Sequence, residues 1–83
     1  MSPEPVATPG LRYWRLSAGY AQSELATLTG VSRSTIQRLE HGRRTTGAIV
    51  TRLTAFLERE LDHPVDLTAP LDERQARRMR GER

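Results

Sequence analysis

The segment VSRSTIQRLEHG, Val31–Gly42, places hydrogen-bonding side chains opposite an apolar pair. Ile36 and Leu39 lie three residues apart, which is the spacing of one face of a helix. The other face carries the polar residues Arg33, Ser34, Gln37 and Arg38. In the DNA major groove, arginine donates two parallel hydrogen bonds to guanine, whereas serine discriminates little between bases. These residues fit a surface that contacts DNA bases, but they also fit an ordinary solvated helix surface. Features elsewhere in the chain are needed to distinguish the two interpretations.

Positive charge is concentrated in and just after this segment. Every basic residue in the 83-residue chain is arginine, and the formal net charge is +3. From Arg33 to Arg44 there are four arginines and only one acid, Glu40. A local basic patch of this kind favours nucleic-acid binding, because phosphate neutralisation supplies much of the affinity.

Several classes of protein are disfavoured by what the chain lacks. Cysteine is absent, and His41 and His63 do not have the spacing of metal ligands, so we expect no metal and no cofactor. We find neither a phosphate-binding glycine loop nor a set of catalytic side chains, so an enzyme or a small-molecule ligand is not expected. No apolar run approaches the roughly 18 residues of a membrane span, and no signal peptide is visible, so we expect a cytoplasmic protein without membrane contact.

A short helix and a glycine turn precede the polar segment. The helix is predicted to begin near Gln22, after Ala21, which is a poor N-cap because it has no side-chain oxygen. Gly30 follows and permits the left-handed backbone of a tight turn. The apolar character of this helix comes from Leu25, Ala26 and Leu28.

The polar segment itself is predicted to be a second short helix. Ser32 is a good N-cap, and Gly42 is a good residue to follow the helix end. A helix of about nine residues is unstable on its own. Ile36 and Leu39 must therefore dock it onto a scaffold.

The rest of the chain supplies that scaffold. Thr8 and Pro9 are predicted to start a helix over residues 9–18, residues 43–46 a polar loop, and periodic apolar residues predict a helix over 47–61. The fold class is therefore all-α, a compact domain of four or five helices over residues 9–71. We expect a flexible N-terminal arm, residues 1–8. Asp72 could cap a short helix at the C-terminal end, but residues 72–83 are polar on every side, so we expect a frayed, arginine-rich tail.

The segment QSELATLTGVSRSTIQRLEHG resembles the helix-turn-helix of the XRE family, which includes the phage Cro and lambda-type repressors. The resemblance extends over about residues 11–67 and rests on a joint pattern: LRYWR, Gln22, the Leu25–Ala26 pair, Gly30 and LEHG. It implies a lambda-repressor-like domain whose second helix enters the DNA major groove. Ala21, Thr29 and His41 depart from the family's usual residues, and Pro70 interrupts the region of its fifth helix.

The resemblance also implies roles for individual residues. Those that would read bases are Arg33, Ser34, Gln37 and Arg38, although Arg38 could bind a phosphate instead. Those that would contact phosphates are Gln22, Ser32, Arg43, Arg44 and Thr46. Arg15 and Glu40 would form a structural ion pair that orients the recognition helix.

The function implied is that of a sequence-specific, double-stranded-DNA-binding transcriptional regulator, namely a bacterial or phage repressor. Proteins of this family usually bind a near-palindromic operator as a homodimer, and the dimer contact would use Val65, Leu67 and Leu71. The alternative is a helix-turn-helix protein-interaction module, of the antitoxin or inhibitor type, with little DNA binding of its own.

Overall fold

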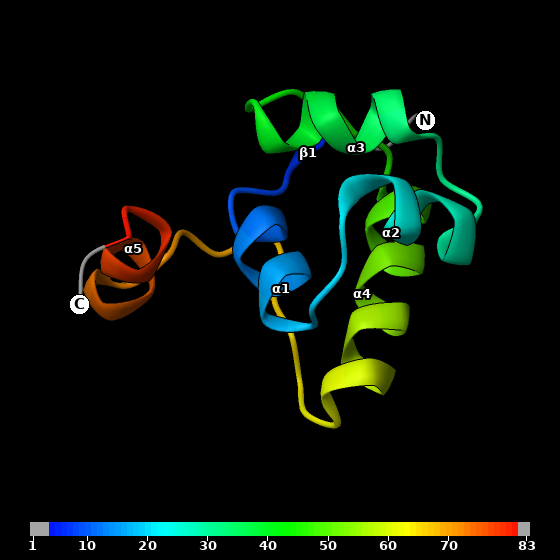
Figure 1. Cartoon of the computed structure of the whole chain (residues 1–83). Coiled ribbons are helices and arrows are strands. Elements are labelled where there is room, and N and C mark those ends of the chain that lie inside the picture. Colours follow the sequence, from blue (N-terminus) through cyan, green and yellow to red (C-terminus); the bar gives the residue numbers. More distant parts are fainter. Residues whose placement is uncertain (1–3, 82–83) are drawn as a thin grey trace.

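The computed structural model describes residues 4–81, which form five helices and a sheet of two short strands (Figure 1). The helices are α1 (Leu11–Ser17), α2 (Gln22–Thr29), α3 (Arg33–Glu40), α4 (Gly47–Leu61) and α5 (Glu73–Met79). The strands are β1 (Val6–Ala7) and β2 (Arg44–Thr45). The predicted helical fold is confirmed, whereas the sheet was not expected from the sequence.

The turn between α2 and α3 forms as the sequence predicts. Gly30 has a φ of 75°, and its N–H donates a hydrogen bond to the Ala26 carbonyl at 2.9 Å. Ser32 caps α3, because its hydroxyl oxygen accepts a hydrogen bond from the Thr35 N–H at 3.1 Å. A left-handed glycine and a capped helix start thus set the direction in which α3 leaves α2.

The core is built from aliphatic side chains that come from α1 to α4 and from two connecting segments. Ile36 and Leu39 are buried in it and dock α3, as their spacing predicts. Leu28 is 54% exposed and takes no part in the core. The buried apolar residues are Leu11, Leu25, Val31, Ile36, Leu39, Leu53, Leu57, Val65 and Leu67.

The first helix starts later than the sequence predicts. It begins at Leu11 with Gly10 at its N-cap, so Thr8 and Pro9 do not start the helix. Thr8 is buried, its carbonyl accepts a hydrogen bond from the Leu11 N–H at 3.1 Å, and its hydroxyl has no partner among residues 4–81. Thr8 thus lies buried in the segment before α1, and Gly10 takes the N-cap position that was predicted for Thr8.

The segment before Thr8 is also more ordered than the expected flexible arm. β1 pairs antiparallel with β2, with Val6 opposite Thr45 and Ala7 opposite Arg44. The predicted polar loop at residues 43–46 therefore contains a strand. Two-residue strands have no sequence periodicity, and their pairing depends on a partner that is distant in the chain. Residues 1–3 of the predicted arm lie outside the described residues.

Two of the three residues predicted to form the dimer contact lie in the core of the monomer. Val65 and Leu67 are only 6% and 1% exposed, because the chain turns at Asp62 and packs both against the monomer's own core. The Leu67 carbonyl accepts a hydrogen bond from the Gly10 N–H at 3.1 Å, which ties this segment to the start of α1. Their burial leaves little side-chain area for a dimer contact, and of the three predicted residues Leu71 is the one that is partly exposed.

Most of the predicted frayed tail is a short helix. Asp72 caps α5 by accepting a hydrogen bond from the Gln75 N–H at 2.7 Å, and the Gln75 side chain accepts one from the Asp72 N–H at 3.0 Å. α5 buries none of its residues and lies beside α1, at the edge of the body formed by α1 to α4 (Figure 1); Arg78 and Met79 line a hollow together with Leu16 and Ser17. Local capping therefore offsets the lack of a core-facing side. Residues 82–83 of the predicted tail lie outside the described residues.

Candidate nucleic-acid interface

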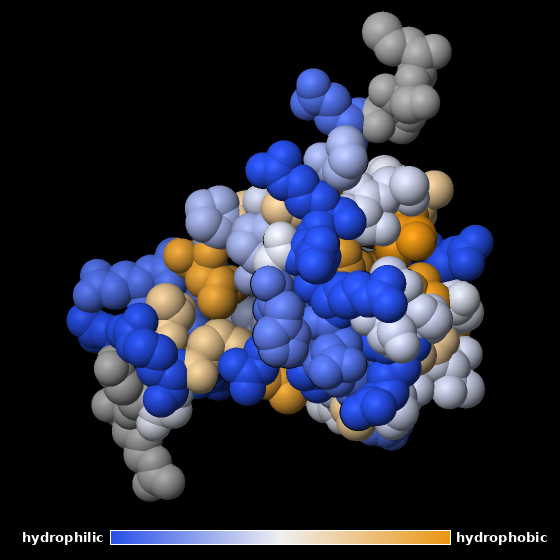
Figure 2. Space-filling view, turned by 90° about the horizontal axis from the view of Figure 1, so that it is seen from above, coloured by the Kyte–Doolittle hydropathy of each residue, from blue (hydrophilic) through white to orange (hydrophobic). Residues whose placement is uncertain are grey.

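One side of α3 is exposed and polar. The structure brings together there the four residues predicted to read bases, Arg33, Ser34, Gln37 and Arg38, and all four are exposed. Figure 2 looks down on the face that carries α3 and shows hydrophilic side chains gathered across its centre. The opposite side of the helix holds the buried Ile36 and Leu39. The helix is thus anchored by one side and free to contact a partner with the other.

Two further arginines lie directly after α3. Arg43 and Arg44 are exposed, and the Arg43 N–H donates a hydrogen bond to the Arg38 carbonyl at 3.0 Å. Arg44 lies in β2, where Ala7 of β1 is its partner. The N-terminal strand, which sequence reasoning missed, therefore holds the backbone of Arg44, one of the predicted phosphate contacts.

Two of the predicted phosphate contacts use their hydroxyls to cap helices. The Ser32 oxygen accepts a hydrogen bond from Thr35, and the Thr46 oxygen accepts one from the Ile49 N–H at 3.4 Å. Both residues are exposed. Each hydroxyl still has a hydrogen, and in Ser32 it is donated to Thr35 Oγ1 at 2.8 Å. Capping is thus a second role of these hydroxyls, one that their positions at helix starts indicate.

A hollow of about 420 Å³ opens between α3, β2 and the start of α4. Its lining contains three arginines, Arg38, Arg43 and Arg44, and none of them forms an ion pair within residues 4–81. The other lining residues are Thr35, Leu39, Thr45 and Ile49. Arg38 therefore lies beside the predicted phosphate contacts as well as on the polar side of α3.

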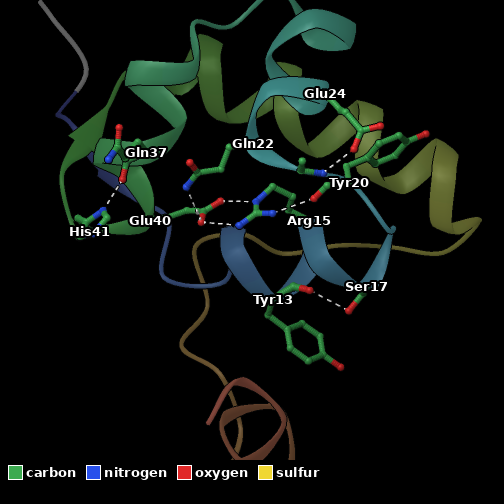
Figure 3. Close-up of polar contacts among 10 residues, drawn as sticks. Tyr13, Arg15, Ser17, Tyr20, Gln22, Glu24, Gln37, Glu40 and His41 are labelled. Atoms are coloured by element: carbon green, nitrogen blue, oxygen red, sulfur yellow. Dashed lines mark hydrogen bonds and ion pairs between the residues drawn. The ribbon is translucent and has the colours of Figure 1, made fainter. Parts of the chain in front are cut away.

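The predicted structural ion pair is present behind α3 (Figure 3). Arg15 Nε donates to Glu40 Oε2 at 2.6 Å, and Arg15 Nη2 donates to Glu40 Oε1 at 2.9 Å. A third donor, Nη1, bonds the Tyr20 carbonyl at 2.8 Å. The two side chains are only 8% and 3% exposed. This two-pronged pair joins α1 to the end of α3 and fixes the orientation of the recognition helix.

Gln22 lies at the edge of this ion pair and is half-buried. Its Nε2 donates a hydrogen bond to Glu40 Oε1 at 3.2 Å (Figure 3). A residue predicted to touch a phosphate is therefore part of the network that orients α3. No local sequence pattern indicates this contact, because Gln22 and Glu40 are 18 positions apart.

The start of α2 has no capping hydroxyl but has one hydrogen bond to the Glu24 side chain. The Ala21 N–H donates a hydrogen bond to Glu24 Oε1 at 2.9 Å. Beside it, Tyr20 packs against Phe56 with ring centroids 5.5 Å apart. Desolvation raises the pKa of Tyr20, and the nearby carboxylate of Glu60 raises it further. Tyr20 thus packs against α4 and secures the start of α2.

The three-residue turn between α2 and α3, with the exposed arginines of α3, defines a helix-turn-helix DNA-binding protein. A helix-turn-helix family model matches residues 11–63, which contain α1 to α4, and the chain belongs to this XRE-type family. Comparisons with curated proteins and with solved structures gave no significant match. The family assignment makes the chain a helix-turn-helix regulator that binds double-stranded DNA.

Residues 4–81 contain neither a candidate membrane span nor a candidate metal site. No helix within residues 4–81 is both long and apolar enough to cross a membrane. In that range, no three side chains of the metal-binding types gather closely enough to hold an ion. Proteins of this helix-turn-helix family are DNA-binding regulators and are generally not enzymes.

Proposed function

We propose that the protein is a cytoplasmic bacterial or phage repressor that binds a near-palindromic operator as a homodimer, with α3 in the major groove. The observation that carries this proposal is the exposed polar side of α3, held in place by its buried side. An α-helix fits the major groove, and residues near its N-terminus meet base edges. Occupation of the operator would then block transcription.

Base reading is assigned first to Arg33, the first residue of α3. Arginine recognises guanine O6 and N7 together, so each half-site should contain a preferred guanine. Ser34 and Gln37 are next to it on the exposed side of the helix, and Arg38 is the second candidate for a guanine contact. The long arginine side chains, rather than Ser34, should determine the preference.

Phosphate contacts are assigned to residues on both sides of α3. Arg43 and Arg44 follow the helix and are exposed, and Gln22 precedes it at the start of α2. Ser32 and Thr46 would add hydroxyl contacts while they cap their helices. Each arginine that neutralises a phosphate should steepen the dependence of DNA affinity on salt.

Dimerisation is proposed because one recognition helix reads few base pairs. In a dimer, half-site centres lie about one helical turn, roughly 34 Å, apart. With Val65 and Leu67 buried in the monomer, a contact in this region would be built from Leu71 and the end of α4. Sedimentation of the protein with and without DNA tests this, and a monomer under both conditions would contradict it.

The testing experiment is selection of random duplex DNA by the purified protein, repeated with Arg33→Ala. Recovery of a two-fold symmetric motif is the expected result. The variant should lose the preference at one position per half-site, by about 1–3 kcal/mol. Arg59→Ala is the matched control, because Arg59 is also exposed but lies in the last turn of α4.

The same experiment distinguishes the proposed function from the alternative. A protein-interaction module should give no motif, only weak binding that fades as salt rises. It should also keep its protein partner after Arg33 and Arg38 are replaced. A motif that is altered by Arg33→Ala but not by Arg59→Ala excludes that alternative.

A further inference from the structure

The hollow beside α3 gathers positive charge from three different segments. Arg38 comes from α3, Arg43 from the turn after it, and Arg44 from β2. Within residues 4–81, no carboxylate forms an ion pair with any of them. Like charges that line one space repel one another, and the repulsion is relieved when an anion enters.

The remaining lining also suits a bound oxyanion. Thr35 accepts a hydrogen bond from the Ser32 hydroxyl at 2.8 Å, so its own hydroxyl hydrogen is left for a further acceptor. Thr45 adds a second hydroxyl. The volume, about 420 Å³, lies within the usual range of small-molecule sites, about 300–1,000 Å³.

Charge matching indicates which phosphate fits best. A phosphodiester of the DNA backbone carries a single negative charge. A terminal phosphate monoester carries about 1.5 to 2 negative charges at neutral pH. Three arginines around one hollow therefore match a terminal phosphate better than a backbone phosphate, and guanidinium groups bind phosphate oxygens in pairs.

We propose that this hollow binds the terminal phosphate of a small molecule, a phosphate monoester or polyphosphate, through Arg38, Arg43 and Arg44, and that this ligand competes with DNA. The binding itself requires only the hollow. The competition rests on the proposed function, because the same arginines would contact the operator. The ligand would thus act as an inducer that releases the repressor.

The experiment is a calorimetric titration of pyrophosphate into the full chain without DNA, at constant ionic strength. Saturable binding is expected, weakened about tenfold in Arg38→Gln and in Arg44→Gln, because each removes a charge-assisted hydrogen-bond donor. Arg59→Gln is the control. It removes the same charge from α4, about 15 Å further along the helix than Ile49, which lines the hollow. Circular dichroism establishes that each variant is folded.

Two outcomes overturn the binding proposal. One is the absence of saturable pyrophosphate binding by the wild-type chain. The other is equal weakening in all three variants, which would show a general effect of net charge.

A second arm adds a selected DNA duplex and separates this proposal from the proposed function. Displacement of the duplex by pyrophosphate supports competition, and a duplex that stays bound overturns it. If pyrophosphate binds but no DNA motif is ever recovered, the proposed function fails and the phosphate site stands. If a motif is recovered but pyrophosphate does not bind, the hollow is only a backbone contact.

Discussion

Arg15 and Arg38 are both arginines next to or on α3, but they lie on opposite sides of that helix and their surroundings differ. Arg15 lies behind α3, almost fully buried, with bonds to both Glu40 oxygens and to the Tyr20 carbonyl. Arg38 lies on the outer side of α3, is exposed, and has no ion pair within residues 4–81. Arg15 uses its hydrogen-bond donors within the protein, whereas those of Arg38 remain available to a binding partner.

The comparison teaches that arginine content alone does not identify a DNA-binding surface. Since every basic residue of the chain is arginine, residue type cannot separate structural from functional positions. Partner and burial do separate them: Arg15 belongs to the frame that orients α3, and Arg33, Arg38, Arg43 and Arg44 belong to the surface that the frame presents. The frame consists of Arg15, Glu40, Gln22 and the turn at Gly30. The surface consists of those four exposed arginines.

The largest expected effect is on the frame. Arg15→Ala leaves Glu40 buried without its partner, and should cost about 3–5 kcal/mol of the free energy of unfolding. That is a large share of the roughly 5–15 kcal/mol typical of a folded domain. Urea unfolding followed by circular dichroism measures the loss.

Arg38→Ala is the matched control on the surface and should change stability by no more than about 0.5 kcal/mol. A double replacement, Arg15→Met with Glu40→Leu, should recover most of the lost stability, because no charge is then buried without a partner. Equal destabilisation by Arg15→Ala and Arg38→Ala would break the distinction between frame and surface.

The next effect concerns the turn that joins α2 to α3 in the frame. An alanine at Gly30 must adopt the left-handed φ of 75°, which costs roughly 1–2 kcal/mol. Crowding is not the cause, since the nearest atom to an added Cβ is Arg52 Nη1 at 3.7 Å. Differential unfolding in urea measures the loss of stability in Gly30→Ala.

Gly47→Ala is the control, because Gly47 has open space and no positive φ at the start of α4. It should be neutral or slightly stabilising, since alanine is the better helix former. If both alanine variants lose the same stability, the cost does not come from the left-handed turn.

The third effect concerns the surface, where β1 pairs with the strand that carries Arg44. Deleting residues 1–7 removes β1 and leaves β2, with Arg44, without its strand partner. Reordering a loosened residue costs about 1 kcal/mol, so DNA affinity should fall roughly fivefold, with helix content unchanged. Fluorescence anisotropy with a selected duplex measures the affinity.

The deletion also removes Glu4, and Glu4→Gln measures the effect of that charge separately. A deletion variant with full affinity would show that β1 does not position the residues proposed to contact phosphates. A loss of helix content would show instead that β1 belongs to the frame.

The smallest effect depends on pH. Asp66 Oδ1 accepts hydrogen bonds from the Thr68 N–H at 2.9 Å and the Thr68 hydroxyl at 2.6 Å, and these bonds lower the pKa of Asp66 below its ordinary value of 3.8. A lowered pKa contributes stability above that value, and the contribution is lost as the pH falls through the folded-state pKa.

Asp66→Ala should therefore be slightly less stable than the wild type at neutral pH, with the difference in melting temperature shrinking in acid. Thr68→Val tests the cause, since it removes the hydroxyl that lowers the pKa of Asp66. A difference in melting temperature that is constant with pH would assign the effect to packing rather than to charge.

The sequence predicts the elements that carry their own local signals. The apolar period over residues 47–61 gives the bounds of α4, because one long side of the helix faces the core. Ser32 and Gly30 locate α3 and the turn before it, because capping and left-handed backbone demand particular residue types. The pairing of Arg15 with Glu40, across 25 positions, was predicted only through the family resemblance.

The features that the sequence did not reveal depend on distant partners. The apolar side chains of Val65 and Leu67 would suit a dimer surface as well as a core. The turn after α4, which packs both against the rest of the monomer, places them in the core. The pairing of β1 with β2 likewise has no local pattern. α5 is different, because Asp72 is a local signal for a helix start, and only the lack of an apolar side favoured a frayed tail there.

The pairing of β1 with β2 also affects how the protein should be handled. Because β1 is bonded to the segment that follows α3, a tag or fluorescent fusion attached ahead of β1 would leave the molecule beside the recognition helix. There it would compete with DNA for space and add its own charge to any binding measurement. α5 lies apart from α3 (Figure 1), so a label placed after α5 would leave the DNA-facing side accessible.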